Sequence, residues 1–473
     1  MLDEPRVREA LVGLGALAVF AAGAARTVVW ADSAKLTIYA LGPYAPSLNP
    51  GDHPGWSLLA WLWRHSLPWL GPVVGCHLLS AAAGAGAVWL AAGLLRAAGR
   101  PPEGALVLAA AHPLWWASSL AETYAPAVLL VLLTARLTAR PTAARAGLAG
   151  LAAGFGIAVH SMTAALTAPL LLALPRRWWP AGIAGGIAGL APVWLAAWGT
   201  PRDPLTGHMA GGAGSWRWHL TAFLDPGRTV HGAILLAGLL ALALGPLGLL
   251  AHLRRSPNGK ALHPWPAGGW AALAALAVLL SGYAPYRLHL MTAFLVTGLF
   301  LLRPPEAPGP HGPAHAALQA ALYAALAAGL VATGHGTLGV RVLPHRNNAA
   351  YFLEPWKAGV TGARRYVDEL LGAAPPGAVV LADFNPGAPL VLAQRVDGLR
   401  PDVAVVPTAV DEALAAPDPA DALARRIRDA APRPVVLADG WEPYYRLEAL
   451  RKRFGFRLER CGPGWRVTPP PAP

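Results

Sequence analysis

Two acidic residues and a histidine follow the first hydrophobic run of the chain. Asp32 lies in the stretch WADSAK, and Asp52 and His53 lie in PGDHPGW. A carboxylate can act as a general base, and an Asp beside a His can orient a substrate or bind a divalent cation. Two residues make a poor metal motif, so we assign no metal ligand, and a divalent cation stays an alternative. For Asp32 the alternative role is the N-cap of the following helix.

Other polar residues interrupt apolar stretches further along the chain. Glu122 and Tyr124 lie in SLAETYAP, Arg217 lies in GSWRWH, and Tyr286 and Arg287 lie in GYAPYRLH. A Glu inside an apolar stretch is costly and usually faces a cavity or a partner. Glu122 is therefore a candidate catalytic residue, and the alternative is a buried tether between helices. We expect the tyrosines and arginines to bind substrate.

The composition is that of a membrane protein with a smaller soluble part. The chain has 473 residues, of which 55% are hydrophobic and 13% are charged, whereas soluble domains have about 25% charged residues. Long apolar runs continue to about Gly336 and then stop. We therefore predict a transmembrane domain over residues 1–336 and a soluble domain over residues 337–473. The net charge of +13 does not indicate nucleic-acid binding, because the arginines form short clusters between apolar runs.

The apolar runs predict an α-helical polytopic membrane protein with about eleven transmembrane helices. The predicted helices are Leu11–Val29, Val73–Leu95, Ala105–Trp116, Leu120–Ala135, Gly147–His160, Met162–Leu174, Pro180–Trp198, Val230–His252, Gly269–Tyr283, Leu290–Leu302 and Ala316–Thr333. The arginine clusters follow every second run, and loop arginines mark the cytoplasmic side. The N-terminus is then cytoplasmic in a bacterial inner or plasma membrane. The first loop, residues 30–72, and everything after Gly334 lie on the exterior, periplasmic side.

The C-terminal part predicts a small α/β domain. Three short apolar segments, AVVLADF, DVAVVPT and PVVLADG, alternate with helical patterns, as in a parallel sheet. Asp383 and Asp439 follow the first and third of these strands, at the ends where open α/β sheets bind ligands. They are either a catalytic pair or loop caps in a supporting domain.

The order of the motifs resembles an uncharacterised bacterial polytopic membrane family related to the animal transmembrane protein O-mannosyltransferase. Asp32-Ser33 resembles the start of its DSGE-type motif, and HPGWSLL from His53 resembles its HPPGYPL-like stretch. HLLSAAAGA from His77 is similar to its NLLSAL-like segment, and AETYAP around Glu122 is similar to its AEVYTL-like turn. The segment from VVLADF to DVAVV is similar to its strand–helix–strand pattern. The resemblance covers most of the chain and is weakest between residues 165 and 280.

The resemblance implies a GT-C glycosyltransferase fold and an inverting enzyme. Such an enzyme takes a sugar, here mannose, from a polyprenyl-phosphate lipid and transfers it to a hydroxyl of an exported protein or glycan. Asp32 then corresponds to the catalytic carboxylate of the first exterior loop. Arg217 or Arg287 can hold the phosphate, because a guanidinium binds phosphate oxygens bidentately. Lys35 replaces the family's acidic residue, so Asp52 or Glu122 is the alternative base.

Two other functions remain open at the level of sequence. A transporter or flippase for lipid-linked sugars would also use buried polar residues, but it predicts inverted repeats, and we find none. A non-catalytic membrane scaffold would explain the departure at Lys35. The glycosyltransferase requires no soluble cofactor, because the lipid tail of its donor would lie between helices.

Overall fold

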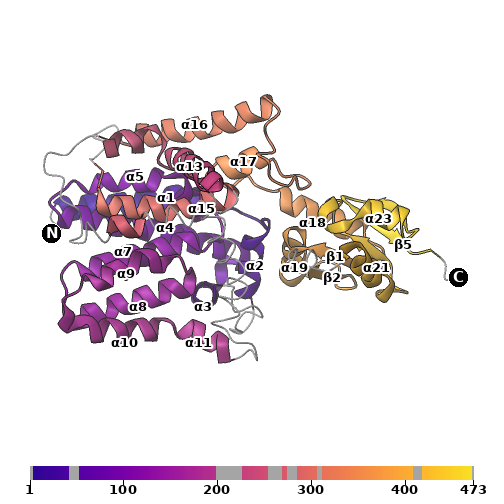
Figure 1. Cartoon of the computed structure of the whole chain (residues 1–473), viewed down its shortest axis with the longest axis horizontal. Coiled ribbons are helices and arrows are strands. Elements are labelled where there is room, and N and C mark those ends of the chain that lie inside the picture. The colour runs from indigo at the N-terminus through magenta and orange to yellow at the C-terminus, as the bar shows by residue number, and fades with distance from the viewer. Residues whose placement is uncertain are drawn as a thin grey trace. The chain divides into compact units, whose positions relative to one another are not determined.

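The computed structural model describes residues 4–41, 53–198, 226–253, 269–273, 285–305, 312–408 and 418–470. The chain divides into two units, each drawn from separate parts of the sequence (Figure 1). The helical unit comprises residues 1–24, 39–340 and 348–358. The α/β unit comprises residues 25–38, 341–347 and 359–473. The segment that contains Asp32 therefore belongs to the α/β unit, although it lies near the N-terminus of the chain.

The helical unit consists of helices of very different lengths. Its longer helices are α1 (Glu4–Gly23), α3 (Pro54–Ser66), α4 (Pro72–Ala97), α7 (Tyr124–Thr138), α8 (Ala143–Val159), α13 (Pro226–Leu253), α15 (Pro285–Leu302) and α16 (Gly312–Ala332). Its shorter helices are η1 (Pro68–Leu70), η2 (Pro102–Ala105), α5 (Leu106–Ala110), α6 (His112–Ser118), α9 (Thr163–Leu172), η3 (Arg176–Trp178), α10 (Trp179–Gly189), α11 (Ala191–Trp198) and α17 (Asn348–Leu353).

The prediction of about eleven transmembrane helices in a GT-C-like membrane fold is wrong. Among the described residues, one helix, α4, is long and apolar enough to cross a membrane. The other apolar runs are interrupted. The predicted helix Ala105–Trp116 breaks at Ala111, where ψ is 121° before Pro113, and Pro180–Trp198 is divided into α10 and α11 at Leu190. Gly245 breaks α13 with a φ of 63°.

Glycines bring α8 and α10 into backbone contact. A Cβ atom at Gly150 would lie 1.9 Å from the Gly182 carbonyl oxygen, and one at Gly154 would lie 2.2 Å from the Gly186 carbonyl oxygen. Small residues four apart on both helices allow this close approach. Helices α7, α8 and α10 consequently form a tightly packed layer, visible at the lower side of the helical unit in Figure 1.

The α/β unit contains a five-stranded sheet in the order β2-β1-β3-β5-β4. The strands are β1 (Val379–Asp383), β2 (Ala404–Thr408), β3 (Val435–Leu437), β4 (Arg457–Cys461) and β5 (Gly464–Thr468). The helices are α2 (Asp32–Tyr39), α18 (Gly362–Ala373), α19 (Phe384–Asp397), α21 (Pro419–Asp429), α22 (Glu442–Tyr445) and α23 (Leu447–Lys452). The last residue of α2, Tyr39, is assigned to the helical unit. Leu381 of β1 pairs in parallel with Val406 of β2 and Leu437 of β3.

The first three strands lie where the sequence predicts them, and the last two do not appear in the prediction. Strand β1 is buried along its whole length, as expected for the centre of a parallel sheet. Strands β4 and β5 form an antiparallel hairpin in which Cys461 pairs with Gly464. The intervening Gly462, with a φ of 58°, was a usable turn signal, because Gly at the first central position is typical of a type II′ hairpin.

Candidate functional site

The polar candidates of the helical unit lie where several helices begin or end. Helix α7 begins at Tyr124, α3 begins just after His53, and α8 ends just before His160. His77 near the start of α4 accepts a hydrogen bond from the Ala121 backbone N–H at 2.8 Å. Helix ends carry backbone groups without partners inside the helix, so polar side chains there satisfy them. We call this the polar end of the helical unit.

The hydrogen bonds fix the proton positions on three imidazoles. The Nδ1 atom of His53 lies 2.8 Å from the Val159 carbonyl oxygen and must donate, since a carbonyl only accepts. The Nδ1 atoms of His77 and His160 accept from the Ala121 and Met162 backbone N–H groups, at 2.8 and 3.3 Å. In its neutral form, His53 thus carries its lone pair on Nε2, and the other two carry the proton there.

Aromatic contacts join two of these histidines to α7 and α15. The rings of His53 and His160 stack with centroids 5.3 Å apart. Tyr124 and Phe294 lie 4.9 and 5.3 Å from the His160 ring. The structure therefore brings two predicted substrate-binding residues, His53 and Tyr124, together around His160, which the sequence analysis did not select.

Glu122 is buried at the same polar end. Glu122 is 7% exposed, and its backbone N–H and carbonyl groups both bond to the Ser80 hydroxyl. The Glu122 N–H donates to Ser80 Oγ at 3.2 Å, and Ser80 Oγ donates to the Glu122 carbonyl at 3.3 Å. Helix α4 thus fixes the backbone of the AETY turn through His77 and Ser80.

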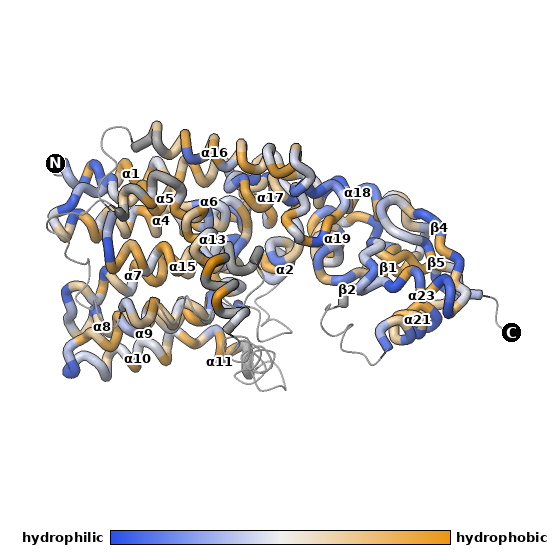
Figure 2. The backbone as a smooth tube through the Cα atoms, turned by 45° about the horizontal axis from the view of Figure 1, so that its top comes forward, coloured by the Kyte–Doolittle hydropathy of each residue, from blue (hydrophilic) through white to orange (hydrophobic). Residues whose placement is uncertain are grey.

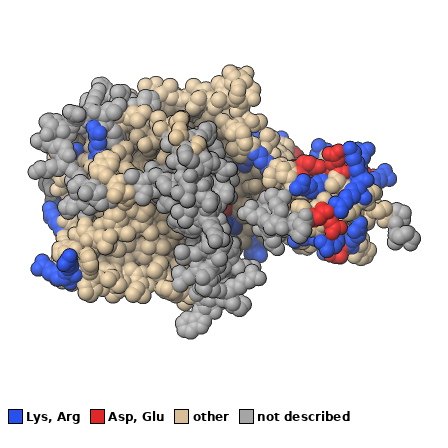
Figure 3. Space-filling view, in the orientation of Figure 1, with Lys and Arg blue, Asp and Glu red and all other residues tan. Residues whose placement is uncertain are grey.

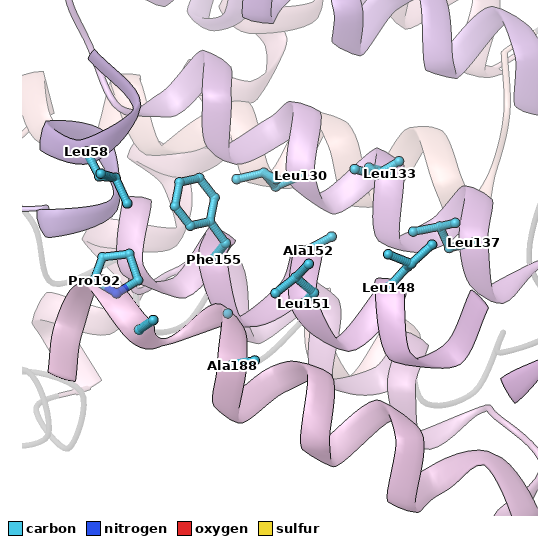
Figure 4. A pocket seen from close by; sticks show the side chains of 12 residues that line it. Leu58, Leu130, Leu133, Leu137, Leu148, Leu151, Ala152, Phe155, Ala188 and Pro192 are labelled. Carbon is cyan, nitrogen blue, oxygen red and sulfur yellow. The ribbon is translucent and has the colours of Figure 1, made fainter. Parts of the chain in front are cut away.

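An apolar cavity, open to the surface, lies among α3, α7, α8, α10 and α11. It has a volume of about 510 Å³ and is lined by Leu58, Leu130, Leu133, Leu137, Leu148, Leu151, Ala152, Phe155, Ala188, Gly189, Ala191 and Pro192. Figure 4 shows these side chains along α7 and α8, with Leu137 and Leu148 at one end and Leu58, Phe155 and Pro192 at the other. Leu58 and Phe155 each lie five residues from a polar-end histidine, His53 and His160 respectively. All twelve lining residues are apolar, and the cavity extends along α8 in the direction of the polar end.

A lysine that the sequence analysis did not select is fully buried in the helical unit. Lys357 Nζ donates to the carbonyls of Glu354 and, at 3.3 Å, Trp356. The rings of Trp116 and Tyr351 lie 5.4 and 5.5 Å from it. Burial lowers the pKa of Lys357. The sequence does not indicate that Lys357 is buried, because a single Lys after an apolar run is usually a surface residue.

In the α/β unit, Arg341 joins the carboxylates at the ends of β1 and β3. Its guanidinium bonds both Asp383 oxygens at 2.8 and 2.9 Å and also bonds Asp439. The Tyr445 hydroxyl donates to Asp383 Oδ2 at 2.8 Å, and Trp441 covers the guanidinium at 4.4 Å. We call these five residues the ion cluster.

The ion cluster is buried, and its two carboxylates share one guanidinium. Asp383 is fully buried, and the Arg341 side chain is 9% exposed. Burial by itself lowers the pKa of Arg341, but the hydrogen bonds and charges of Asp383 and Asp439 outweigh it and raise that pKa. Burial, with the nearby Asp383 charge, raises the pKa of Tyr445 well above its usual value. Because Asp383 and Asp439 hold Arg341, the geometry favours a supporting role for this pair over a catalytic one.

The predicted base Asp32 is the first residue of α2 in the α/β unit. Its side chain is 57% exposed and lies 3.0 Å from Lys35 Nζ. Asp52 and Arg217 lie outside the described residues. Tyr286 and Arg287 lie in α15 (Pro285–Leu302), of which the structure describes only the backbone at these positions. Within the described residues, no group of three or more His, Cys, Asp or Glu is arranged to hold a metal ion.

The comparisons with known proteins identify no relative. No protein-family model matches the chain, and no curated protein and no solved structure is significantly similar to it. Any function must therefore be argued from the residues and their geometry.

Proposed function

We propose that this protein is a membrane-associated glycosyltransferase that moves a sugar from a polyprenyl-phosphate donor to a hydroxyl of an exported protein or glycan. The observation that carries the proposal is the apolar cavity of about 510 Å³ that runs toward the polar end. Such a cavity suits the hydrocarbon tail of a lipid-linked substrate. Ligand sites of this volume are common, and they combine apolar walls with a few polar groups.

The surface of the helical unit supports an association with lipid. Apart from Val342 and Val406, the large apolar side chains exposed among the described residues all belong to the helical unit. Figure 2 shows hydrophobic residues along most of its helices, and Figure 3 shows charged atoms gathered on the α/β unit. Exposed apolar surface of this kind marks a lipid or protein contact.

Two arginines of the helical unit, Arg96 and Arg136, lie at helix ends remote from the polar end. They are in the last turns of α4 and α7, whereas His77 is the sixth residue of α4 and Tyr124 is the first residue of α7. Arg96 bonds Glu9 at 2.5 Å, and Arg136 bonds the Gly93 carbonyl at 2.7 Å. These two arginines thus lie away from the polar end, on the same two helices.

The proposed reaction requires a base, an acceptor and a leaving group. The base takes the proton of the acceptor hydroxyl while the hydroxyl oxygen attacks the anomeric carbon of the sugar. The bond from this carbon to the phosphate oxygen breaks, the configuration inverts, and polyprenyl phosphate leaves with the bonding electrons. We assign Asp32 as the base, because its carboxylate is exposed, with Glu122 as the alternative. Arg217 or Arg287 is proposed to hold the phosphate, and mannose is the sugar that the family resemblance implies.

The proposal is tested by sugar transfer with the purified full chain in liposomes. A set of radiolabelled polyprenyl-phosphate sugars serves as donors, and an exported protein and glycan fraction serves as acceptor. Removing a general base costs about 10²–10⁴-fold in rate, so Asp32→Asn should lose transfer while keeping the wild-type thermal stability. Asp397→Asn, a partly exposed carboxylate of the same unit, is the matched control and should retain transfer.

Three other outcomes of the same assay have distinct meanings. Loss of transfer in Glu122→Gln but not in Asp32→Asn would assign the base to Glu122. Movement of labelled donor across the liposome membrane without covalent transfer would support a transporter of lipid-linked sugars instead. If no donor is either moved across the membrane or used for transfer, the enzyme proposal is contradicted and the scaffold function remains.

A further inference from the structure

The segment Trp30–Lys35 contains several local features that are unfavourable for stability. Ala31 has a φ of 55°, in the left-handed region that residues with a Cβ atom avoid. Trp30 Nε1 and Ser33 Oγ are buried and have no hydrogen-bond partner among the described residues. Strained backbone and unsatisfied polar groups persist where the surrounding structure enforces them, and they concentrate at functional sites. Something must therefore hold this segment in place.

Two contacts fix the segment to the sheet of the α/β unit. The Trp30 ring lies 5.1 Å from the Tyr366 ring, and the Tyr366 hydroxyl donates to the Ala438 carbonyl at 2.7 Å. Ala438 directly follows β3. Lys35 Nζ lies 5.2 Å from the centroid of Phe384, which directly follows β1. The segment thus packs at the carboxyl ends of the two central parallel strands.

This edge of the sheet is the place where an α/β fold ordinarily binds a ligand. Strands β2 and β3 lie on opposite sides of β1, so the direction of chain progression reverses between β1 and β3, and ligands bind at such a switch point. Here Arg341 of the chain itself bridges Asp383 and Asp439 at this place. The ion cluster makes the edge rigid and occupies it, so the edge can serve as a support.

Within the supported segment, the Asp32 side chain is exposed to solvent while most of its neighbours are buried. Ser33, Ala34, Leu36 and Thr37 are at most 1% exposed, whereas the Asp32 side chain is 57% exposed. Lys35 Nζ lies 3.0 Å from the Asp32 carboxylate, so Lys35 contacts both Asp32 and Phe384. Its ion pair limits the directions in which the carboxylate can point.

We propose that the α/β unit positions the catalytic base, with Trp30, Lys35, Tyr366 and Phe384 as positioning residues that act through Asp32. This inference rests on the proposed function, because it takes Asp32 as the base. It gives the α/β unit a role in the reaction that requires no ligand of its own. Lys35 then orients the Asp32 carboxylate through the ion pair.

The first test separates rate from binding. Lys35→Met removes the ion pair and the positive charge beside the Phe384 ring, and it should lower the kcat of sugar transfer at least about tenfold while donor KM stays within about twofold. Lys35→Arg keeps the charge and the ring contact and should restore most of the rate. The matched control is Lys452→Met, which removes the exposed ion pair with Glu448 on α23 and should leave kcat unchanged.

The second test does not depend on activity. Hydrogen–deuterium exchange of the full chain should show faster exchange of residues 31–38 in Trp30→Ala, with exchange in β1 and β3 unchanged. Trp30→Phe keeps a ring against Tyr366 and should exchange as the wild type does. Tyr366→Phe and Phe384→Leu give independent variants should Trp30→Ala fail to fold.

The outcomes distinguish this inference from the function on which it rests. No transfer by the wild-type protein with any donor would overturn the proposed function and, with it, the role of Asp32. Transfer by the wild type with unchanged kcat in Lys35→Met would overturn the positioning role alone. Unchanged exchange in folded Trp30→Ala would overturn the support of this segment by the α/β unit.

Discussion

The two units bury their polar side chains in different ways. In the helical unit, His53, His77 and His160 bond backbone groups at helix ends. In the α/β unit, Arg341 and Asp383 bond side chains of opposite charge. The helical unit thus uses single polar groups to satisfy its helix ends, whereas the α/β unit forms a network of oppositely charged side chains. Loss of one member should cost more in the network, because the remaining charge stays buried.

The largest effect is therefore expected in the ion cluster. Asp383→Ala leaves Arg341 without its bidentate partner, and breaking a buried pair costs about 3–5 kcal/mol of unfolding free energy. Pulse proteolysis of the full chain in urea, read on fragments of the α/β unit, measures this change. In Lys452→Met the exposed pair should contribute at most about 0.5 kcal/mol. Similar losses in both variants would show that the cluster does not stabilise the unit.

The next effect concerns helix packing in the helical unit. A Cβ atom at Gly150 would lie 1.9 Å from the Gly182 carbonyl oxygen, so Gly150→Ala must separate α8 from α10 and should cost about 1–3 kcal/mol. Gly329 of α16 has no atom within 4 Å of an added Cβ. Gly329→Ala should therefore stabilise by about 0.5–1 kcal/mol through helix propensity. Thermal unfolding in detergent should show opposite signs, and equal shifts would contradict the close packing.

Histidine substitutions test whether the polar end depends on neutral hydrogen bonds. His77→Phe leaves the buried Ala121 N–H without its acceptor and should cost at least about 1 kcal/mol. His77→Asn places an oxygen near the Nδ1 position and should recover most of that loss. Both are read by the same thermal unfolding. Equal destabilisation in the two variants would mean that ring packing, rather than the hydrogen bond, matters at this position.

The smallest effect is an alkaline pH dependence of the α/β unit. Burial, with the Asp439 and Asp383 charges, raises the pKa of Tyr366 well above its usual value, so the folded state keeps a proton that the unfolded chain loses near pH 10. This contribution is complete below about pH 10 and is lost as the pH rises further. Tyr366→Phe should flatten the decline, as measured by pulse proteolysis between pH 8 and 11. The same slope in both proteins would contradict the assignment.

The α/β unit was more predictable from sequence than the helical unit. Its first three strands are short apolar segments bounded by turn residues, and Asp383 and Asp439 fall at their carboxyl ends as expected. Arg341 could not be predicted as their partner, because it lies 42 residues from Asp383 and 98 from Asp439. Local patterns do not reveal pairings over such separations.

In the helical unit, composition was misleading about helix length. Apolar runs were taken as continuous spans, but Pro113, Leu190 and Gly245 coincide with breaks that hydrophobicity alone does not show. Motif order selected His53, Glu122 and Tyr124, yet it gave no sign that Asp32 belongs to the α/β unit. That membership depends on the packing of Trp30 against Tyr366, which is 336 residues away in sequence and visible only in three dimensions.

Steady-state kinetics of sugar transfer against donor concentration tests the central claim most directly, using a variant that fills the apolar cavity. Ala188 lines the cavity, whereas Ala184, an exposed residue one turn earlier on α10, does not. The account predicts that Ala188→Trp raises donor KM at least about tenfold with little change in kcat, and that Ala184→Trp behaves as the wild type. An unchanged donor KM in folded Ala188→Trp would contradict the claim that a polyprenyl-phosphate sugar binds in this cavity.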